Sequence, residues 1–305
     1  MNKDFDLVYV FQISPITMAW PAILIKKIKK IPLIIHCLDQ WPISVTIGPI
    51  KKGSLIYNII YKISVWTYNQ ANTITISSKS FKNYFINELN ISKKSKKLIY
   101  YPSYAESCYG NINFENNKVF DLVFAGNIGP AQSVETIIEA ANILKNHKDI
   151  FFHIVGDGLS KKNCEDLAKK YKLKNIKFYG YFPVEEMPKF YNKADAFLIT
   201  MVNNDVVNNT LPAKIQSYML SGKPIIGAIS GEVKNVVKDA NCGLCCESLD
   251  YNELAKIILE AKNNSDMLKI WSKNSKNYYL KYFEKDKCIN NLVKSMKKTI
   301  RDYNE

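Results

Sequence analysis

The chain has 305 residues, of which 47% are hydrophobic and 12% aromatic, so it is neither fibrous nor disordered and is long enough for two domains. Its formal net charge is +14, and the excess lies near the start, because residues 1–110 hold 14 lysines against five acidic residues, a net of +9. No apolar run reaches the roughly 18 residues that cross a bilayer and no signal peptide is recognisable, so we expect a cytoplasmic protein.

The first third of the chain contains three repeats of a strand followed by a helix. Short apolar segments alternate with longer ones whose apolar residues recur at nearly helical spacing. The repeats predict β-α-β units and a parallel sheet. The expected strands are 6–11, 32–37 and 71–76, and the expected helices are 14–30, 53–69 and one that opens at 77–80.

Lysines gather in two clusters of this region, at 26–30 and 93–97. Each basic residue near an anionic lipid surface contributes about 1 kcal/mol of attraction, so peripheral contact with the inner face of the cell membrane is one interpretation. Solvated helix and loop ends are an equally good one. We expect no nucleic-acid partner, because Arg301 is the only arginine and arginine is the side chain best suited to phosphate recognition.

A polar, asparagine-rich stretch follows Cys108 and predicts an interdomain linker. We expect a first domain over 1–110, the linker over 111–118, a second domain over 119–284 and a terminal helix over 285–305. In the second domain, strand and helix patterns alternate, which predicts a doubly wound parallel sheet with ligands at the carboxyl ends of its strands. The expected strands are 120–125, 150–155, 176–179, 196–200 and 224–227, and the helices are 133–146, 160–171, 184–193, 213–221, 251–262, 266–283 and 285–303.

Two glycine turns follow strands of this second domain. Gly126, Asn127 and Gly129 lie in the first turn and Gly156 in the second. Backbone N–H groups at such a turn, together with the positive end of the next helix, bind a diphosphate. The same pattern is equally typical of an ordinary strand-to-helix connection. Tyr181 follows the next strand, where an aromatic ring is more often part of the core than a platform for a base.

The seven cysteines are an odd number and most of them are isolated in the sequence. Cys242 and Cys245 have the C-x-x-C spacing, but there is no second pair and no nearby histidine, so core or strand thiols are favoured over a zinc site. We therefore expect no disulfides, no metal and no cofactor.

The segment 211–227 combines a lysine at a helix start, a helix stop at Gly222 and a short buried strand. Taken with the two glycine turns, it resembles the donor-binding half of GT-B glycosyltransferases of the family 4, WbuB-like type that builds surface polysaccharides. The resemblance implies an α/β fold with two Rossmann-like, doubly wound domains, of which the first lacks its opening units. It also implies a terminal helix that packs back toward the first domain.

The resemblance implies an activity as well. Such enzymes transfer a sugar, with retention of anomeric configuration, from a nucleotide-sugar donor that is most often UDP-linked. The acceptor is lipid-linked or a saccharide. Asp39 and Lys214 are the implied catalytic residues, with Lys214 stabilising the departing diphosphate without a metal. The implied donor-binding residues are Gly126, Asn127, Gly129, Gly156, Tyr181, Asn209, Thr210, Leu211 and Ser217.

The sequence also departs from the family pattern. Many relatives carry two glutamates eight positions apart, where this chain has Asn209 and Ser217, and Ile43 replaces the glutamate of the turn that contains Asp39. Two alternatives therefore stay open. One is an inactive or truncated homologue that binds nucleotide sugar or partners another transferase. The other is a sugar-nucleotide epimerase, which is disfavoured because acidic residues are scarce around the candidate site.

Overall fold

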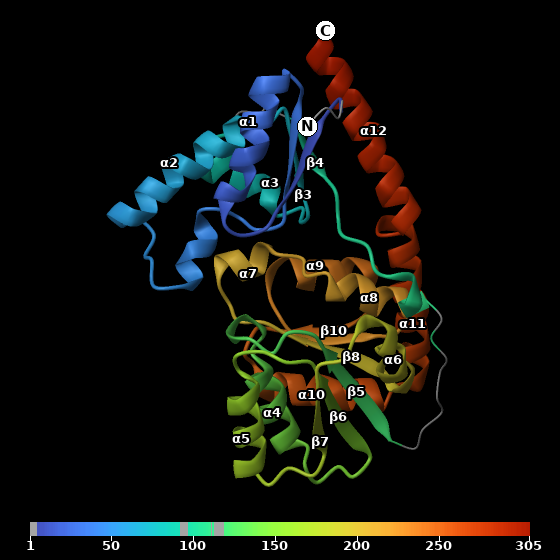
Figure 1. The fold of residues 1–305 in the computed structure, drawn as a ribbon. Helices are drawn as coiled ribbons and strands as arrows, with labels where there is room; N and C mark the ends of the chain where they lie inside the picture. Colours follow the sequence, from blue (N-terminus) through green and yellow to red (C-terminus); the bar gives the residue numbers. More distant parts are fainter. Residues whose placement is uncertain (1–4, 92–96, 111, 113–118) are drawn as a thin grey trace. The chain divides into compact units, whose positions relative to one another are not determined.

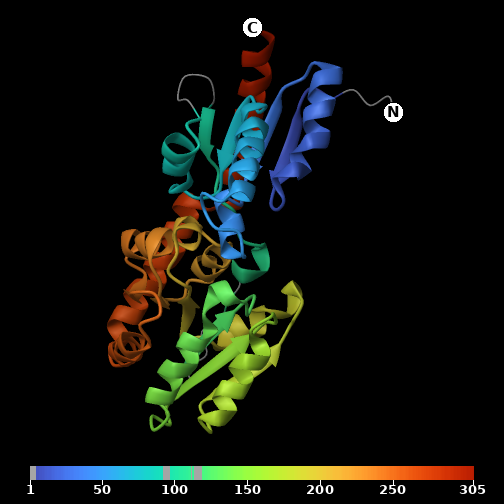
Figure 2. The same cartoon turned by 90° about the vertical axis from the view of Figure 1, so that its left-hand side faces the viewer.

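The structure, a computed structural model, describes residues 5–91, 97–110, 112 and 119–305. The described residues form two compact α/β units, drawn in Figures 1 and 2. The first contains the chain up to Ser103 together with Asn209–Leu211 and Lys285–Glu305, and the second contains Tyr104–Asn208 and Pro212–Glu284. The expected α/β fold with two Rossmann-like units is confirmed.

The first unit is built on a four-stranded parallel sheet in the order β1-β2-β3-β4. Figures 1 and 2 show α1 and α2 next to each other on one side of this sheet and α12 on the other. The hydroxyls of Thr73 in β3 and Thr299 in α12 lie 2.8 Å apart and are both buried. The elements are β1 (Val8–Gln12), α1 (Trp20–Lys29), β2 (Leu33–Cys37), α2 (Leu55–Asn69), β3 (Thr73–Ile76), α3 (Phe81–Asn83), β4 (Lys97–Tyr100) and α12 (Lys285–Asn304).

Two helices of this unit begin later than the sequence pattern indicates. The α-helix expected from residue 14 starts at Trp20, after a 3-10 turn at Ile16–Ala19, because Pro21 lacks an N–H and suits only the first helical turn. Helix α2 starts after Ser54, whose hydroxyl accepts a hydrogen bond from the Tyr57 N–H at 3.2 Å. Strand β4 was not expected. The lysine cluster at 93–97 lies, except for Lys97, outside the described residues.

The second unit is built on a six-stranded parallel sheet in the order β10-β9-β8-β5-β6-β7. The chain therefore reverses its direction of growth between β5 and β8, and the carboxyl ends of strands at such a reversal are where α/β sheets bind ligands. The strands are β5 (Phe120–Ala125), β6 (Ile150–Val155), β7 (Ile176–Gly180), β8 (Ala196–Thr200), β9 (Ile225–Ala228) and β10 (Gly243–Cys246).

Helices cover this second sheet on both faces. One layer joins α5, α4 and α10 over a core that includes Phe124 and Phe152, and α8 packs on α11. The helix expected over 184–193 is a 3-10 turn at Val184–Glu186 followed by α6, because Pro188 breaks the backbone hydrogen-bond pattern. The helices are α4 (Val134–Ile143), α5 (Lys161–Lys170), α6 (Pro188–Lys193), α7 (Asp205–Asn209), α8 (Lys214–Leu220), α9 (Gly231–Ala240), α10 (Tyr251–Lys262) and α11 (Ser265–Tyr282).

The segment Tyr104–Gly110 belongs to the second unit, whereas the sequence places it before the expected linker. It is attached at several points: the Ala105 N–H donates to the Tyr279 hydroxyl at 3.3 Å, and the Tyr109 ring packs 4.5 Å from the Tyr191 ring. Of the expected linker, only Ile112 is among the described residues. Within the described part of the chain, no helix combines the length and apolarity needed to cross a membrane.

Candidate functional site

A cavity of about 580 Å³ opens in the second unit, where β5, β6 and β7 end. Its walls come from the turns after these strands, from the start of α8 and from the segment that begins at Tyr104. The lining residues are Tyr104, Ala105, Glu106, Tyr109, Ala125, Gly126, Asn127, Val155, Gly156, Asp157, Tyr181, Phe182, Val184, Met187, Tyr191, Ala213, Lys214 and Ser217.

The floor of the cavity is formed by two glycine turns in direct contact. Gly126 has a φ of +136° and Gly156 a φ of +143°, values that residues with side chains rarely adopt. A Cβ at Gly156 would lie 1.8 Å from the Gly126 carbonyl oxygen, so only glycine fits. Asn127 is exposed on the first turn and donates to Gln132 at 3.1 Å.

Lys214 lies beside this floor with a buried amine. Its Nζ is 4.1 Å from the centroid of the Phe124 ring, and a Cβ at Gly126 would lie 2.9 Å from it. Among the described residues this Nζ has no hydrogen-bond partner. Burial lowers the pKa of Lys214 to about 7, because a charged amine loses its hydration there. An anion bound in the cavity would therefore stabilise the protonated form of the Lys214 amine.

Helix α8, which carries Lys214, is tied to the end of β5. The Tyr218 hydroxyl accepts from the Ala125 N–H at 2.9 Å and donates to the Ala125 carbonyl at 3.0 Å. The Tyr218 ring stacks on Phe197 of β8, with centroids 4.0 Å apart. Both contacts fix the start of the helix against the glycine turn, so the Lys214 amine is placed before any ligand arrives.

Ser217 lies one turn further along α8, and its hydroxyl is already engaged. It donates to the Lys214 carbonyl at 2.9 Å and lies 2.8 Å from the Tyr191 hydroxyl. Tyr191 in turn packs against Tyr109. Tyr191 and Tyr109 could not be predicted as part of the site, because the ring contact between them joins positions 82 residues apart.

The outer wall carries aromatic rings and two acidic side chains. Tyr181 is 75% exposed at this wall, where a planar base has room to stack. Asp157 accepts from the Gly158 N–H at 2.8 Å and pairs with Lys161 at 3.1 Å, and these contacts lower its pKa. Glu106 is exposed, and its carboxylate has no ion pair among the described residues of the lining.

Five of the nine donor-binding candidates line this cavity together with Lys214. Lys214, Gly126, Asn127, Gly156, Tyr181 and Ser217 line the cavity. Gly129 is buried in the same turn as Gly126 but does not line the cavity. Asn209, Thr210 and Leu211 group with the first unit and are absent from the described lining.

Asp39 belongs to the first unit, in the turn after β2. Its carboxylate accepts hydrogen bonds from the Ser14 hydroxyl and, at 3.1 Å, from the Trp41 indole N–H. Its backbone carbonyl accepts from Gln12 at 3.2 Å and from Tyr68 at 3.4 Å. The carboxylate is thus held in one orientation by a turn that is itself fixed from the core.

His36 and the cysteines are structural. His36 is 1% exposed, lies 2.8 Å from the Thr75 hydroxyl, and burial lowers its pKa to about 4, so it is a neutral core residue. All seven cysteines are free thiols, and Cys245 and Cys246 lie in β10. Among the described residues, no group of three or more acidic, histidine and cysteine side chains is arranged to hold a metal ion.

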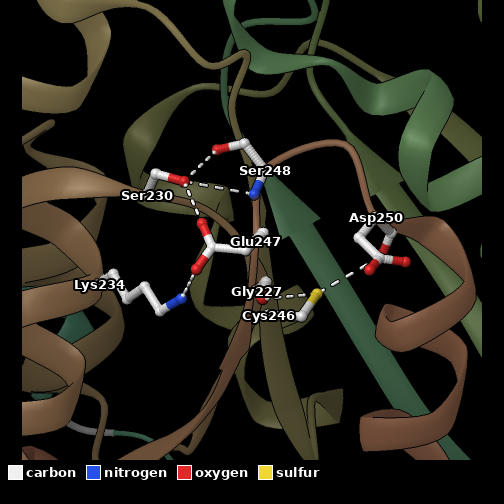
Figure 3. A network of polar contacts seen from close by, with 7 residues as sticks. All are labelled: Gly227, Ser230, Lys234, Cys246, Glu247, Ser248 and Asp250. Carbon is white, nitrogen blue, oxygen red and sulfur yellow. Dashed lines mark hydrogen bonds and ion pairs between the residues drawn. The ribbon is translucent and has the colours of Figure 1, made fainter.

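A second polar cluster lies where β9 and β10 end, and Figure 3 shows Glu247 at its centre. The Glu247 carboxylate accepts from the Ser230 hydroxyl at 3.0 Å and pairs with Lys234. The Ser248 hydroxyl donates to Ser230 at 3.1 Å. The hydrogen bonds from Lys234 and Ser230 lower the pKa of Glu247. Each charged group in this cluster therefore has a partner within it.

The chain is similar to known proteins in both sequence and fold. A family model described as "Glycosyl transferases group 1" matches residues 110–278. The chain is 23% identical over 243 residues to "Probable glycosyltransferase WbjE" of Pseudomonas aeruginosa, which covers 75% of this chain and 58% of that protein. It is 26% identical over 205 residues to "O-antigen biosynthesis glycosyltransferase WclY" of Escherichia coli, which covers 65% of this chain and 55% of that protein. The chain thus spans less than two thirds of the length of either relative.

Solved structures share the fold. The crystal structure of Anabaena Alr3699/HepE in complex with UDP superposes with a TM-score of 0.79 at 16% identity, over 96% of this chain and 79% of that one. The same protein in complex with UDP-glucose gives a TM-score of 0.77 at 17% identity, over 96% and 79%. A glycosyltransferase from Rickettsia africae gives 0.75 at 15% identity, over 97% and 77%.

Proposed function

The chain belongs to the glycosyl transferases group 1 family, and from this premise we propose that it transfers a sugar from a UDP-sugar to an acceptor used in surface polysaccharide biosynthesis. The family resemblance read from the two glycine turns and the segment 211–227 is confirmed by the match over residues 110–278. The choice of donor and pathway draws on similar proteins, one with a crystal structure in complex with UDP-glucose and one named for O-antigen biosynthesis.

The observation that carries the proposal is the buried Lys214 amine. It lies beside the Gly126 turn, lines the cavity and has no hydrogen-bond partner in the described part of the chain. A buried amine without a partner is costly, and a diphosphate in the cavity would supply the missing acceptor and the opposite charge. The backbone N–H groups of the glycine turns would contact the same diphosphate.

Transfer by this site needs stabilisation of the departing nucleoside diphosphate. As the bond from the sugar to the diphosphate breaks, negative charge grows on the diphosphate oxygens, and the protonated Lys214 offsets it in a setting shielded from water. The glycine turns hold the group in place, so the interaction strengthens in the transition state without further rearrangement. Tyr181 would stack on the uracil ring.

We keep Asp39 as the second catalytic residue and propose that retention of anomeric configuration accompanies the transfer. The three contacts of Ser14, Trp41 and Gln12 hold the Asp39 turn and its carboxylate in one orientation. Asp39→Asn should leave UDP binding within about twofold of the native value, because the diphosphate contacts lie in the second unit, and should lower transfer at least about tenfold. A loss of binding equal to the loss of transfer would contradict this division of roles.

The test of the proposed function uses the whole chain with two probes. Isothermal titration with UDP and with ADP should show binding of UDP, and UDP-glucose incubated with a membrane extract as acceptor should release UDP faster than without the extract. Binding without release would favour the non-catalytic, nucleotide-sugar-binding alternative. No binding of either nucleotide would refute the proposed function.

A lipid-linked acceptor would require the protein to approach a membrane, and we propose that α1 and α2 do so. Three apolar side chains of α1 are exposed along one face, Trp20, Leu24 and Ile28, and α2 exposes Leu55, Ile59 and Trp66. Trp20 and Trp66 meet edge to face at 6.3 Å, so the two faces are continuous. Lysines at 26, 27, 29 and 30 adjoin this surface, and an apolar face with a basic border fits an anionic bilayer.

Flotation with vesicles tests this surface. The native chain should float with phosphatidylglycerol vesicles and less with phosphatidylcholine vesicles, and the double change Leu24→Ser and Ile28→Ser should reduce flotation severalfold. Leu159→Ser is the matched control, because Leu159 is an exposed leucine of the second unit. Equal flotation of the double variant and the control would refute the assignment to α1 and α2.

A further inference from the structure

We propose that Glu106 is the residue that binds the ribose of the nucleotide donor, through its 2′- and 3′-hydroxyls. The inference rests on the proposed function and adds to it the side chain that recognises the nucleotide's sugar. Nucleotide-binding α/β folds often assign this task to a carboxylate, which accepts hydrogen bonds from both hydroxyls of the diol. Such charge-assisted bonds are roughly twice as strong as neutral ones.

Helix α8 does not supply such a carboxylate. Its residues from Lys214 to Leu220 include no acidic side chain. After Lys214, the polar side chain of this helix that lines the cavity is Ser217. Its hydroxyl donates to the Lys214 carbonyl at 2.9 Å and lies 2.8 Å from the Tyr191 hydroxyl. Ser217 therefore has at most one acceptor site left for a ligand and no donor.

The lining of the cavity contains two acidic side chains, Glu106 and Asp157. Asp157 is committed, since its two carboxylate oxygens bind the Gly158 N–H and Lys161. Glu106 is exposed and lines the cavity, and no described residue of the lining forms an ion pair or hydrogen bond with its carboxylate. It is the acidic group of the described lining whose acceptor sites remain available.

Glu106 is also held in a fixed place relative to α8. Its carbonyl accepts from the Tyr109 N–H at 3.2 Å, which closes a turn, and the Tyr109 ring lies 4.5 Å from that of Tyr191. Tyr191 contacts Ser217. A short chain of contacts thus connects Glu106 to the α8 wall, and the neighbouring Ala105 N–H is anchored on Tyr279 at 3.3 Å. Glu106 thus belongs to the part of the lining that continues through Tyr109 and Tyr191 to Ser217.

Charge separates the roles of the two ends of the cavity. Lys214 and the glycine turns suit the anionic diphosphate, whereas a carboxylate repels phosphate and binds neutral hydroxyls. Removing the Glu106 charge would therefore have two opposite effects on the affinity for an anionic nucleotide. It would strengthen binding by ending the repulsion of the phosphates, and it would weaken binding by removing the charged acceptor of the ribose hydroxyls. The informative quantity is the ratio of affinities for UDP and 2′-deoxy-UDP, because the electrostatic effect is the same for both ligands.

The experiment measures this ratio by titration calorimetry for the native chain and three variants, Glu106→Gln, Glu106→Ala and Glu185→Gln. Glu185 is the matched control, because its carboxylate, like that of Glu106, is near Tyr109. Burial raises the pKa of Tyr109 to about 12, and both carboxylates add to this shift. Unlike Glu106, Glu185 does not line the cavity. A hydrogen bond to a charged group contributes about 1.5–3 kcal/mol, so the native chain should prefer UDP at least about tenfold. The preference should fall below about threefold in both Glu106 variants and persist in Glu185→Gln.

Three outcomes count against the proposal. If the Glu106 variants keep the native ratio, Glu106 does not bind the ribose, although the chain remains a UDP-binding protein. If the native chain binds UDP and 2′-deoxy-UDP equally, no residue reads the 2′-hydroxyl and the proposal fails in the same way. If the native chain binds neither ligand, the proposed function itself fails and takes this inference with it.

Discussion

At the ends of β9 and β10, Lys234 is paired with Glu247, whereas beside the turn after β5 the Lys214 amine is buried without a hydrogen-bond partner in the described residues. Both lysines lie along the carboxyl edge of one parallel sheet. In the first cluster, Ser230 and Lys234 satisfy the carboxylate, as Figure 3 shows. In the second, the ring of Phe124 is the contact that the structure gives the amine.

The difference separates polar groups that stabilise the fold from those kept for a ligand. A lysine with a carboxylate partner is neutralised by the protein and has little left to offer an anion. Lys214 has its pKa lowered to about 7 by burial, which is unfavourable for the free protein and favourable for binding, because an incoming diphosphate meets a poorly solvated amine.

The largest effect is expected at Gly156, because this glycine forms part of the floor of the cavity after β6. Gly156→Ala would place a Cβ 1.8 Å from the Gly126 carbonyl oxygen, so both turns must move. We expect the free energy of unfolding to fall by about 3 kcal/mol or more. Gly53→Ala is the control, because Gly53 also has a positive φ but a Cβ there meets nothing within 4 Å. Equal losses in urea denaturation would mean that backbone strain alone matters.

Lys214→Met tests the contrast directly. The methionine keeps most of the packing on Phe124 and removes the charge, so UDP binding should weaken by about 1.5–3 kcal/mol, that is, tenfold or more. The free energy of unfolding should stay the same or rise, since a partly ionised buried amine is lost. Lys234→Met should leave UDP binding unchanged in the same calorimetric titration. A stable Lys214→Met chain with native affinity would make Lys214 a packing residue.

The pH dependence of UDP binding sharpens the same point. Because the pKa of Lys214 is about 7 in the free chain, the amine loses its proton above pH 7, and the bound diphosphate must restore it. The apparent affinity should therefore fall by about fivefold between pH 7 and pH 8, and the proton uptake on binding should rise from about half a proton at pH 7 to about 0.9 at pH 8. The free chain changes in the opposite direction, since its unfolded state holds the Lys214 proton up to pH 10 and stability rises with pH over that interval. Titrations in two buffers of different ionisation enthalpy measure the uptake, which should vanish in Lys214→Met.

Local sequence patterns predicted the strands of the second sheet except β10, the glycine turns and the lysine at the start of α8, because each depends on apolar runs or on residues with special backbone freedom. The wall formed by Glu106, Tyr109 and Tyr191 could not be predicted in this way. Tyr109 lies in a segment that looks like the approach to a linker, and its partner is in a helix that Pro188 shortens. Contacts between distant segments leave no periodic signal.

The smallest effect is expected in the cluster around Glu247, where the contacts of the Glu247 carboxylate with Ser230 and Lys234 are exposed. The side chains of Lys234 and Glu247 are 31% and 71% exposed, and ion pairs in such positions contribute about 0.2–1 kcal/mol. Glu247→Gln should therefore lower the free energy of unfolding by about 0.5 kcal/mol at pH 7 and leave UDP affinity unchanged. The pKa of Glu247 is lowered by its contacts with Lys234 and Ser230, so the native chain's advantage should be present above the ordinary glutamate pKa and disappear as the pH falls through the lowered value. Urea denaturation of both chains at neutral and acidic pH measures this. A change in UDP affinity would show that the ends of β9 and β10 take part in binding. It would contradict the distinction between the Glu247 cluster, which stabilises the fold, and Lys214, which binds the ligand.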